Sequence, residues 1–244
     1  MERITSVSNQ LIKTLSSLNQ KKNRIENNQF LVEGLHLVEE ANKLNLLEMV
    51  LSTDEELLNK FNGKKYLVNE LVIKKLSTTV TPQNIVGVVK VFSNDFEYVD
   101  KYIVLDGIQD PGNLGTIIRT SLALGVNHFI LSEACVDIYN EKTIRATQGA
   151  LFQAKCYYAK LDEVYPLLKQ NGNEIIVTSL AAKDTLKTLT KPKKYALVVG
   201  NEANGITDIS KNAADKAIII PLKNNIESLN AAMALGIVLY NLEN

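Results

Sequence analysis

The residue types best suited to chemistry gather in three polar stretches of this chain. The first contains Asn113 and Arg119, the second contains Glu202, and the third contains Ser228 and Asn230. A guanidinium can stabilise a developing oxyanion through charge-assisted hydrogen bonds without losing a proton. A neighbouring carboxylate can orient the guanidinium or hold a substrate group. If the fold brings the three stretches together, they can form one site around an activated oxygen.

Each polar stretch follows an apolar run that is typical of a buried strand. The runs are Tyr102–Leu105, Tyr195–Val199 and Ala217–Ile220. Buried parallel strands have nearly continuous hydrophobic sequences, and open α/β sheets bind ligands at the carboxyl ends of their strands. We therefore predict that the loops after these strands meet at one sheet edge. Arg119, on the helix after the first loop, is expected to point into this site.

Alternation of strands and helices after residue 95 predicts an α/β fold with a parallel sheet covered on both faces. Turn-forming residues at 92–100 separate this part from a smaller α/β unit. We predict two domains, residues 1–95 and 96–244. The strands expected in the second domain are 102–105, 128–131, 155–158, 174–178, 195–199 and 217–220, and its expected helices are 113–125, 140–149, 161–170, 206–215 and 228–241.

Residues 1–95 also alternate between the apolar spacing that is typical of helices and the spacing that is typical of strands. Ser8 or Asn9 can cap a helix with apolar residues at helical spacing, and Lys21, Lys22 and Arg24 suit its C-terminus. The other elements expected here are helices at 34–47 and 70–76 and strands at 30–32, 49–52, 65–68 and 85–91.

The three polar stretches resemble, in order and spacing, the motifs of the SpoU-type (TrmH-like) branch of the SPOUT RNA methyltransferases. A single Gly-x-Glu-x-x-Gly segment recurs by chance, so the resemblance depends on all three motifs across the later part of the chain. The matching residues are Asn113, Gly115 and Arg119 in the first motif, Gly200, Glu202 and Gly205 in the second, and Ile220, Pro221, Ser228, Leu229 and Asn230 in the third.

This resemblance implies a fold and an activity that periodicity does not reveal. It implies a parallel-sheet catalytic domain with a trefoil knot, working as a homodimer. Without the motifs, a plain doubly wound sheet would be expected, because true knots are rare. The implied reaction is methyl transfer from S-adenosylmethionine to a ribose 2′-hydroxyl of RNA, with ribosomal RNA as the expected substrate.

The resemblance also assigns roles to individual residues. Arg119 would activate the hydroxyl. The other implied catalytic residues are Asn113, Glu202, Ser228 and Asn230. The implied cofactor-binding residues are Thr178, Ser179, Leu180, Gly200, Ile220, Leu222, Ser228 and Leu229.

Each of these residues also has a purely structural interpretation. Arg119 could pair with Asp106 or Asp110, and Glu202 could be an exposed loop carboxylate. Asn113 and Ser228 are favoured types for helix N-caps. Ile220, Leu222 and Leu229 could be core residues. Where many relatives carry a glycine in the third motif, this chain has Asn224 and Asn225, and asparagine tolerates the left-handed backbone better than most residues do.

The N-terminal part resembles the ribosomal-protein-like substrate-binding module that precedes many SpoU-type catalytic domains. The matching segments are Arg24, Phe30–Gly34, Leu76–Thr79 and Thr81–Gln83, although Asn84 stands where the module often has glycine. This resemblance implies RNA contacts through Arg24 and Glu33. Arg145, in a segment that also resembles the family, is a further candidate RNA contact, with a plain helix surface as the alternative.

Composition limits the remaining possibilities. The chain has 244 residues, 45% of them hydrophobic, and a formal net charge of zero, which argues mildly against a nucleic-acid partner but does not exclude a local basic face. Cys135 and Cys156 have no ligand-type spacing, so buried thiols are expected rather than a disulfide or metal site. No stretch approaches the length of a membrane span, and Met1–Lys22 lack a signal-peptide pattern. We therefore expect a cytoplasmic protein.

Two other functions compete with this hypothesis. A nucleotide-dependent oxidoreductase would require a Gly-x-Gly-x-x-Gly turn after the first strand, and the segment that starts at Asp106 does not supply it. A non-catalytic RNA-binding protein could share the fold, but it would not need Asn113, Arg119, Glu202, Ser228 and Asn230 together.

Overall fold

Two separate sheets organise the chain in a computed structural model that describes residues 1–92, 95–179, 182–224 and 227–244. The first unit comprises Met1–Phe92 together with Asp137–Phe152, and the second comprises the described residues of Ser93–Val136 and Gln153–Asn244. The suggested boundary near residue 95 did not anticipate that 137–152 packs with the N-terminal part.

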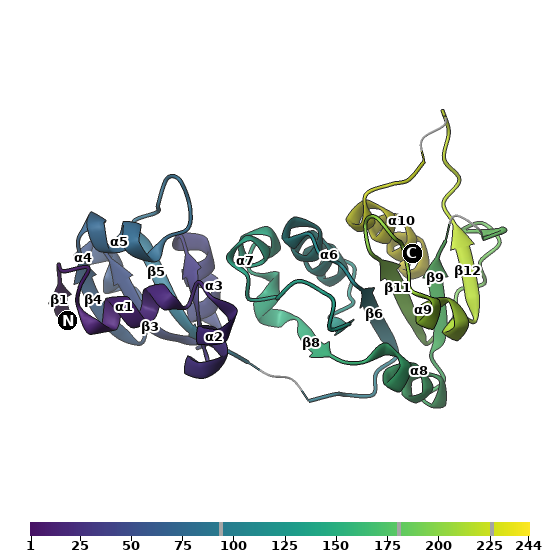
Figure 1. Cartoon of the computed structure of the whole chain (residues 1–244), viewed down its shortest axis with the longest axis horizontal. Coiled ribbons are helices and arrows are strands. Elements are labelled where there is room, and N and C mark those ends of the chain that lie inside the picture. The colour runs from purple at the N-terminus through teal and green to yellow at the C-terminus, as the bar shows by residue number, and fades with distance from the viewer. Residues whose placement is uncertain (93–94, 180–181, 225–226) are drawn as a thin grey trace. The chain divides into compact units, whose positions relative to one another are not determined.

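The first unit contains a mixed five-stranded sheet in the order β1-β4-β3-β5-β2 (Figure 1). β5 pairs antiparallel with β2 and β3, whereas β4 pairs parallel with β1 and β3. Its elements are β1 (Glu2–Ile4), α1 (Gln10–Ser17), α2 (Lys21–Asn27), β2 (Gln29–Glu33), α3 (Leu35–Lys43), β3 (Leu47–Ser52), α4 (Glu55–Leu58), β4 (Lys64–Val68), α5 (Glu70–Leu76), β5 (Ile85–Lys90) and α7 (Glu141–Thr147), followed by the 3-10 helix η1 (Ala150–Gln153).

Several local expectations for this unit need correction. Asn9 caps α1 as expected, but the single helix expected up to Arg24 is two helices, α1 and α2. The helix expected at 34–47 ends at Lys43, because Leu47 starts strand β3. The short elements β1 and α4 were missed, since three or four residues carry little periodicity.

The second unit contains the expected parallel sheet, with seven strands in the order β10-β12-β9-β11-β6-β7-β8. Each strand and helix expected for this unit is present within a few residues, except that the helix expected at 140–149 is α7 of the first unit, and β10 is an addition. Its elements are β6 (Lys101–Asp106), α6 (Pro111–Ala123), β7 (His128–Leu131), β8 (Lys155–Tyr158), α8 (Leu161–Gln170), β9 (Glu174–Thr178), β10 (Asp184–Thr185), β11 (Tyr195–Gly200), α9 (Asp208–Ala213), β12 (Lys216–Ile219) and α10 (Ala231–Glu243).

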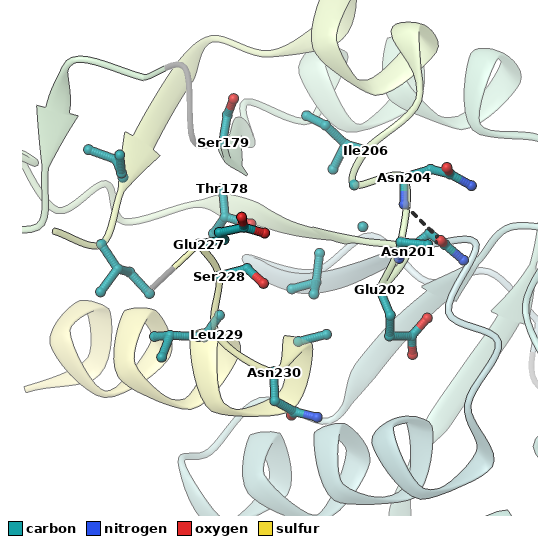
Figure 2. A pocket seen from close by; sticks show the side chains of 18 of the residues that line it. Thr178, Ser179, Asn201, Glu202, Asn204, Ile206, Glu227, Ser228, Leu229 and Asn230 are labelled. Carbon is teal, nitrogen blue, oxygen red and sulfur yellow. Dashed lines mark hydrogen bonds between the residues drawn. The ribbon is translucent and has the colours of Figure 1, made fainter. Parts of the chain in front are cut away.

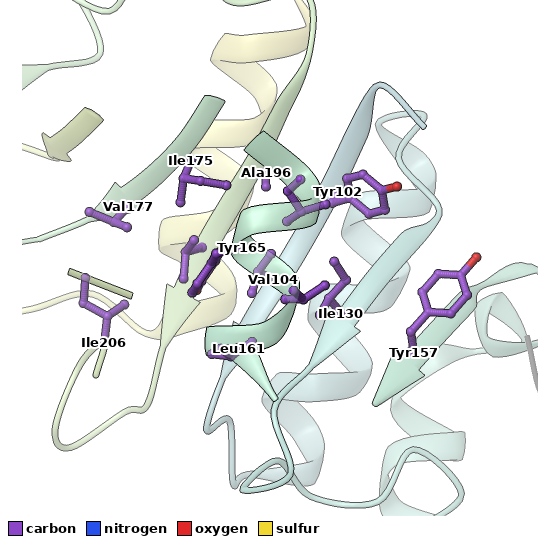
Figure 3. Close-up of a cluster of buried hydrophobic side chains, with 13 residues drawn as sticks. Tyr102, Val104, Ile130, Tyr157, Leu161, Tyr165, Ile175, Val177, Ala196 and Ile206 are labelled. Atoms are coloured by element: carbon purple, nitrogen blue, oxygen red, sulfur yellow. The ribbon is translucent and has the colours of Figure 1, made fainter. Parts of the chain in front are cut away.

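Burial on both faces explains the apolar strand sequences of this sheet. Alternate residues of β6, such as Tyr102 and Val104, pack with Tyr165 and other residues of α8 in one hydrophobic cluster (Figure 3). The intervening residues Ile103 and Leu105 are also fully buried. Strands covered on both faces cannot slide without exposing apolar area, so the loops at their carboxyl ends are held in register.

A buried ion pair anchors segment 137–152 within the first unit. Arg24 Nη2 lies 2.7 Å from Asp137 Oδ2, and the two side chains are only 7% and 14% exposed. Arg24 Nη1 also donates to the carbonyl of Leu18. Nearby, the rings of Phe30 and Tyr139 lie 4.6 Å apart. The segment is therefore held by both charge and aromatic packing.

We expect the substitution Arg24→Ala to loosen this segment, because it leaves the Asp137 carboxylate buried without its partner. Loss of one partner of a buried pair costs about 3–5 kcal/mol. Hydrogen exchange of α7 amides in the full chain should show this fall in local stability. Lys22→Ala is the matched control, since the Lys22–Glu26 pair is exposed (82% and 56%) and worth at most about 1 kcal/mol. Equal effects of the two substitutions would contradict the anchoring role.

Candidate functional site

A cavity of about 680 Å³ opens at the carboxyl ends of β9, β11 and β12. Figure 2 shows residues Asn201–Ile206 along one side of the cavity and Glu227–Asn230 along another, with Thr178 and Ser179 between them. Its volume lies within the range of small-molecule sites, and its wall mixes apolar side chains with a few polar groups, as such sites do. A cavity of suitable size for a small molecule therefore lies at the sheet edge where the strand pattern predicts a site.

The cavity wall contains most of the residues that the family resemblance assigns to the cofactor. Leu180, also expected there, lies outside the described residues. Asn201, Lys211 and Glu227 line the cavity as well and were not anticipated, although Asn201 directly precedes the motif residue Glu202. The expected residues that the structure places in the wall are Thr178, Ser179, Gly200, Ile220, Leu222, Ser228 and Leu229.

Asn113 lies at the start of α6, but it is not the helix cap. Asp110 is the N-cap, and its Oδ1 accepts from the Asn113 backbone N–H at 2.7 Å, while Pro111 begins the helix. Proline suits this position because its missing N–H would have no partner there. The Asn113 side chain, which a capping role would have occupied, is therefore free to face the other motif loops.

Glu202 accepts hydrogen bonds from the loop before α6. Its Oε1 accepts from Asn113 Nδ2 at 2.8 Å, and the backbone N–H groups of Gln109 and Asp110 lie 3.4 Å from its carboxylate oxygens. Partial burial alone would raise the pKa of Glu202, but these hydrogen bonds outweigh it and hold the pKa below its ordinary value of 4.5. Glu202 is therefore a carboxylate at neutral pH.

Asn230, rather than Ser228, caps the last helix. Its Oδ1 accepts from the N–H groups of Ala232 and Met233, and its Nδ2 donates to Asn113 Oδ1 at 2.7 Å. The cap therefore lies two residues after Ser228, whose residue type had suggested it as the cap. The amide of Asn230, which has both a donor and an acceptor, lets it satisfy the helix end and still reach Asn113.

The structure thus joins the three motifs through one chain of side-chain hydrogen bonds. Glu202 accepts from Asn113, and Asn113 accepts from Asn230. Glu202 lies in the loop after β11, Asn113 lies at the start of α6, and Asn230 is the N-cap of α10. Ser228 lines the same cavity.

Arg119 is the exception among the expected catalytic residues. It is exposed, and it is not among the described residues that line the cavity. The reason is helical geometry, because Arg119 follows Asn113 by about 1.7 turns and so faces another direction. Within the part of the chain that the structure describes, it makes no hydrogen bond or ion pair, so pairing with Asp106 or Asp110 is not its role. The expectation that it points into this cavity within one chain was wrong.

Two glycines and one asparagine have backbone conformations that support the loops. A Cβ on Gly200 would lie 2.3 Å from the carbonyl carbon of Gly205, which has φ +69°. Only glycine permits so close an approach at position 200. Asn224 has φ +58°, which confirms that an asparagine accommodates the left-handed position in the third motif, while Asn225 lies outside the described residues.

The three residues expected to contact RNA all belong to the first unit, and each interacts there with other side chains. Arg24 is buried against Asp137. Glu33 accepts from the hydroxyls of Ser77 and Thr79 and from the backbone of Gln83, so it shapes the loop before β5. Half-buried Arg145 lies 3.3 Å from the hydroxyl of Thr78. This geometry favours structural roles for Arg24 and Glu33.

Comparison with known proteins identifies both parts of the chain. Residues 100–240 match the SpoU rRNA Methylase family, and residues 9–87 match the MRM3-like substrate binding domain. The 23S rRNA (guanosine(2553)-2′-O)-methyltransferase RlmP of Bacillus subtilis (strain 168) is 33% identical over 246 residues, covering 99% of each chain.

Solved structures agree with these matches. An AdoMet-bound rRNA methyltransferase from Sinorhizobium meliloti is 31% identical, with a TM-score of 0.90 over 99% of this chain and 97% of that one. A putative RNA methyltransferase of the TrmH family from Porphyromonas gingivalis is 27% identical, with a TM-score of 0.89 and 98% coverage of both chains. With its motifs, its fold and these similarities in agreement, the chain belongs to the SpoU rRNA methylase family.

Proposed function

We propose that this protein is an S-adenosylmethionine-dependent methyltransferase that modifies a ribose 2′-hydroxyl of 23S ribosomal RNA. The observation that carries the proposal is the hydrogen-bond chain from Glu202 through Asn113 to Asn230 beside the cavity. A protein that only binds RNA has no need for it. Two full-length similarities, to an enzyme named as a 23S rRNA 2′-O-methyltransferase and to an AdoMet-bound structure, support the same substrate and cofactor.

The cavity suits S-adenosylmethionine in both size and chemistry. Ile220, Leu222 and Leu229 offer apolar surface for the adenine, while the backbone of the loop after Gly200 offers hydrogen-bonding groups. The hydroxyls of Thr178 and Ser228 also lie in the wall. When bound, the cofactor supplies an electrophilic methyl group.

The residues of this chain then have to orient and activate the ribose hydroxyl. Glu202, Asn113 and Asn230 form the ordered polar edge against which the nucleotide can be positioned. Arg119 remains charged throughout and is suited to stabilising the oxygen as its proton leaves. Because Arg119 lies on another face of α6, something other than the fold of a single chain must bring it close to a cavity.

A homodimer supplies that proximity in our proposal. On α10, Met233, Ile237 and Tyr240 form an exposed apolar stripe, with exposures of 61%, 39% and 63%. Gly236, beside Ile237, packs near Thr120 of α6, where a built Cβ would lie 3.5 Å from Thr120 Cγ2. The helices α6 and α10 are therefore neighbours, and we propose that a dimer formed through this stripe brings Arg119 of each copy to the interface.

The family resemblance further implies a trefoil knot, and we propose a cytoplasmic location. The knot fits a chain path in which β12 pairs on the far side of β9, yet α10 packs on α6 and β11. No helix in the described ranges is long and apolar enough to cross a membrane. We propose that residues 1–95 select the RNA site and that residues 96–244 carry out the transfer, with Arg145 as the remaining candidate RNA contact of the expected set.

We expect Arg119→Ala to lower methyl transfer by about 10²–10³-fold or more, the scale seen when an oxyanion stabiliser is removed. Binding of S-adenosylmethionine, measured by calorimetry, should persist. Methylation is read by mass spectrometry of ribosomal RNA from cells with and without the protein. Lys160→Ala removes an exposed cation elsewhere and should leave transfer unchanged. Near-normal turnover of Arg119→Ala would remove Arg119 from the mechanism.

The lowered pKa of Glu202 predicts how its contact with Asn113 depends on pH. A carboxylate with a depressed pKa keeps its hydrogen bonds above its ordinary pKa and loses them as the pH falls through the lowered value. The NMR resonances of the Asn113 side-chain amide should therefore be constant from neutral pH down to about pH 5, and they should shift only below pH 4.5. Glu202→Gln should abolish the acid shift. If the midpoint of this shift lies above pH 4.5, burial raises the pKa of Glu202 more than the hydrogen bonds lower it.

The dimer proposal predicts that Ile237→Asp yields a monomer, because a carboxylate in an apolar interface must be desolvated without a partner. Sedimentation velocity of the full chain measures the state. Ile209→Asp is the matched control, since Ile209 is 46% exposed and lies on α9 rather than in the α10 stripe. This variant should remain dimeric. If both variants sediment as the unaltered chain does, the α10 stripe is not the interface.

A further inference from the structure

We propose that Asn201 is a positioning residue that sets Glu202 against Asn113 by tying the loop after β11 to the loop after β6. The inference rests on the proposed function, but it concerns a residue to which the motif comparison gave no role. Its basis is a set of contacts that the Asn201 side chain makes in two directions. Among the hydrogen bonds of the described residues, Asn201 is the one residue of 200–206 whose side-chain amide contacts both its own loop and the loop after β6.

The first direction is into its own loop. Asn201 Oδ1 accepts from the backbone N–H groups of Ala203 and Asn204 at 2.9 and 3.1 Å. The backbones of Asn201 and Gly205 also exchange two hydrogen bonds of 2.9 Å. These contacts close residues 201–205 into a tight turn that contains Glu202.

The second direction is across to the first motif. Asn201 Nδ2 donates to the carbonyl of Gly107 at 2.8 Å. Gly107 has φ +78°, a conformation that glycine adopts readily, and its N–H donates to Ser132 Oγ at 2.9 Å. The carbonyl that Asn201 contacts is therefore itself held in place. Two residues later begin the N–H groups that face Glu202.

The exit of the loop is anchored independently. Buried Asp106 accepts from the Thr207 backbone at 2.6 Å, from the Thr207 hydroxyl at 2.8 Å and from the Ser210 hydroxyl at 2.7 Å. Ser210 in turn contacts the hydroxyl of Tyr165 at 2.6 Å. Asp106 thus fixes where the loop ends, whereas Asn201 fixes where it begins, directly beside Glu202.

The two functions of the Asn201 amide can be separated by substitution. In Asn201→Asp, one oxygen can still accept from Ala203 and Asn204, but the other replaces the donor that faces the Gly107 carbonyl. Two oxygens at that distance repel each other, so the loop should keep its turn and move away from the first motif. Asn201→Ala removes both functions. Asn212→Asp, on the exposed surface of α9, controls for the added charge.

The first measurement is hydrogen exchange of peptides covering residues 107–114 in the full chain, which does not depend on activity. In Asn201→Asp, exchange there should rise by roughly tenfold, the scale of a lost hydrogen bond. Asn212→Asp should match the unaltered chain. Unchanged exchange in Asn201→Asp overturns the proposal, whatever the protein catalyses.

The second measurement separates positioning from general structure. Asn201 also lines the cavity, so the rate is measured in single turnover at saturating S-adenosylmethionine. There Asn201→Asp should transfer methyl groups about 10²-fold more slowly, with a much smaller loss of cofactor affinity in calorimetry, because the reacting groups are misplaced. Asn201→Ala should lose both affinity and rate. Equal losses of affinity and rate in Asn201→Asp would show a merely structural role and overturn the inference. An unaltered chain that transfers no methyl group would sink the proposed function, while the exchange data would still decide whether Asn201 couples the loops.

Discussion

The site depends on the Asn113 side chain, which contacts two other loops at once. Its amide donates to Glu202 and accepts from Asn230, so it satisfies a carboxylate on one side and an amide on the other. An amide is suited to this position because it carries both a donor and an acceptor on a short side chain. A carboxylate at position 113 would face the carboxylate of Glu202, and a hydrocarbon would leave both partners without this contact. The Asn113 amide is therefore the side-chain group through which all three polar stretches are joined.

The parallel sheet makes that meeting possible. β6, β9, β11 and β12 are hydrogen-bonded in fixed register, and the buried faces of β6 and β11 oppose any slip by one residue. Three loops from distant parts of the chain therefore emerge at the same level. The helices start at the same edge, where Asp110 and Asn230 satisfy free N–H groups and also hold the site residues. Stability and site geometry are thus supplied by the same caps.

The first unit shows how side chains that resemble RNA contacts can instead serve the fold. Arg24 is a buried cation in a substrate-binding module, and it forms an ion pair with Asp137, which is only 14% exposed. Glu33 is held by Ser77, Thr79 and Gln83. Both residues shape segments that remain at the surface, including the loop that carries fully exposed Val80. The chain is a SpoU-family RNA methyltransferase, and the selection of the RNA site by its first unit, which we propose, would use the surface that these residues support.

The sequence alone determined most elements of the second unit, its parallel sheet and the edge at which the site lies, and the motif resemblance added seven expected cofactor residues of the cavity wall. These features follow from local apolar patterns and from motif spacing, which need no knowledge of distant contacts. Only the tertiary structure decided that Asp110 and Asn230 are the caps, that residues 137–152 pack with the first unit, and that Arg119 faces away from the cavity. A side chain's role depends on which distant groups compete for it, and a helix turns a residue about 100° with each step. The type of a residue specifies neither which distant groups compete for its side chain nor the direction in which that side chain points, so both are set only in the folded chain.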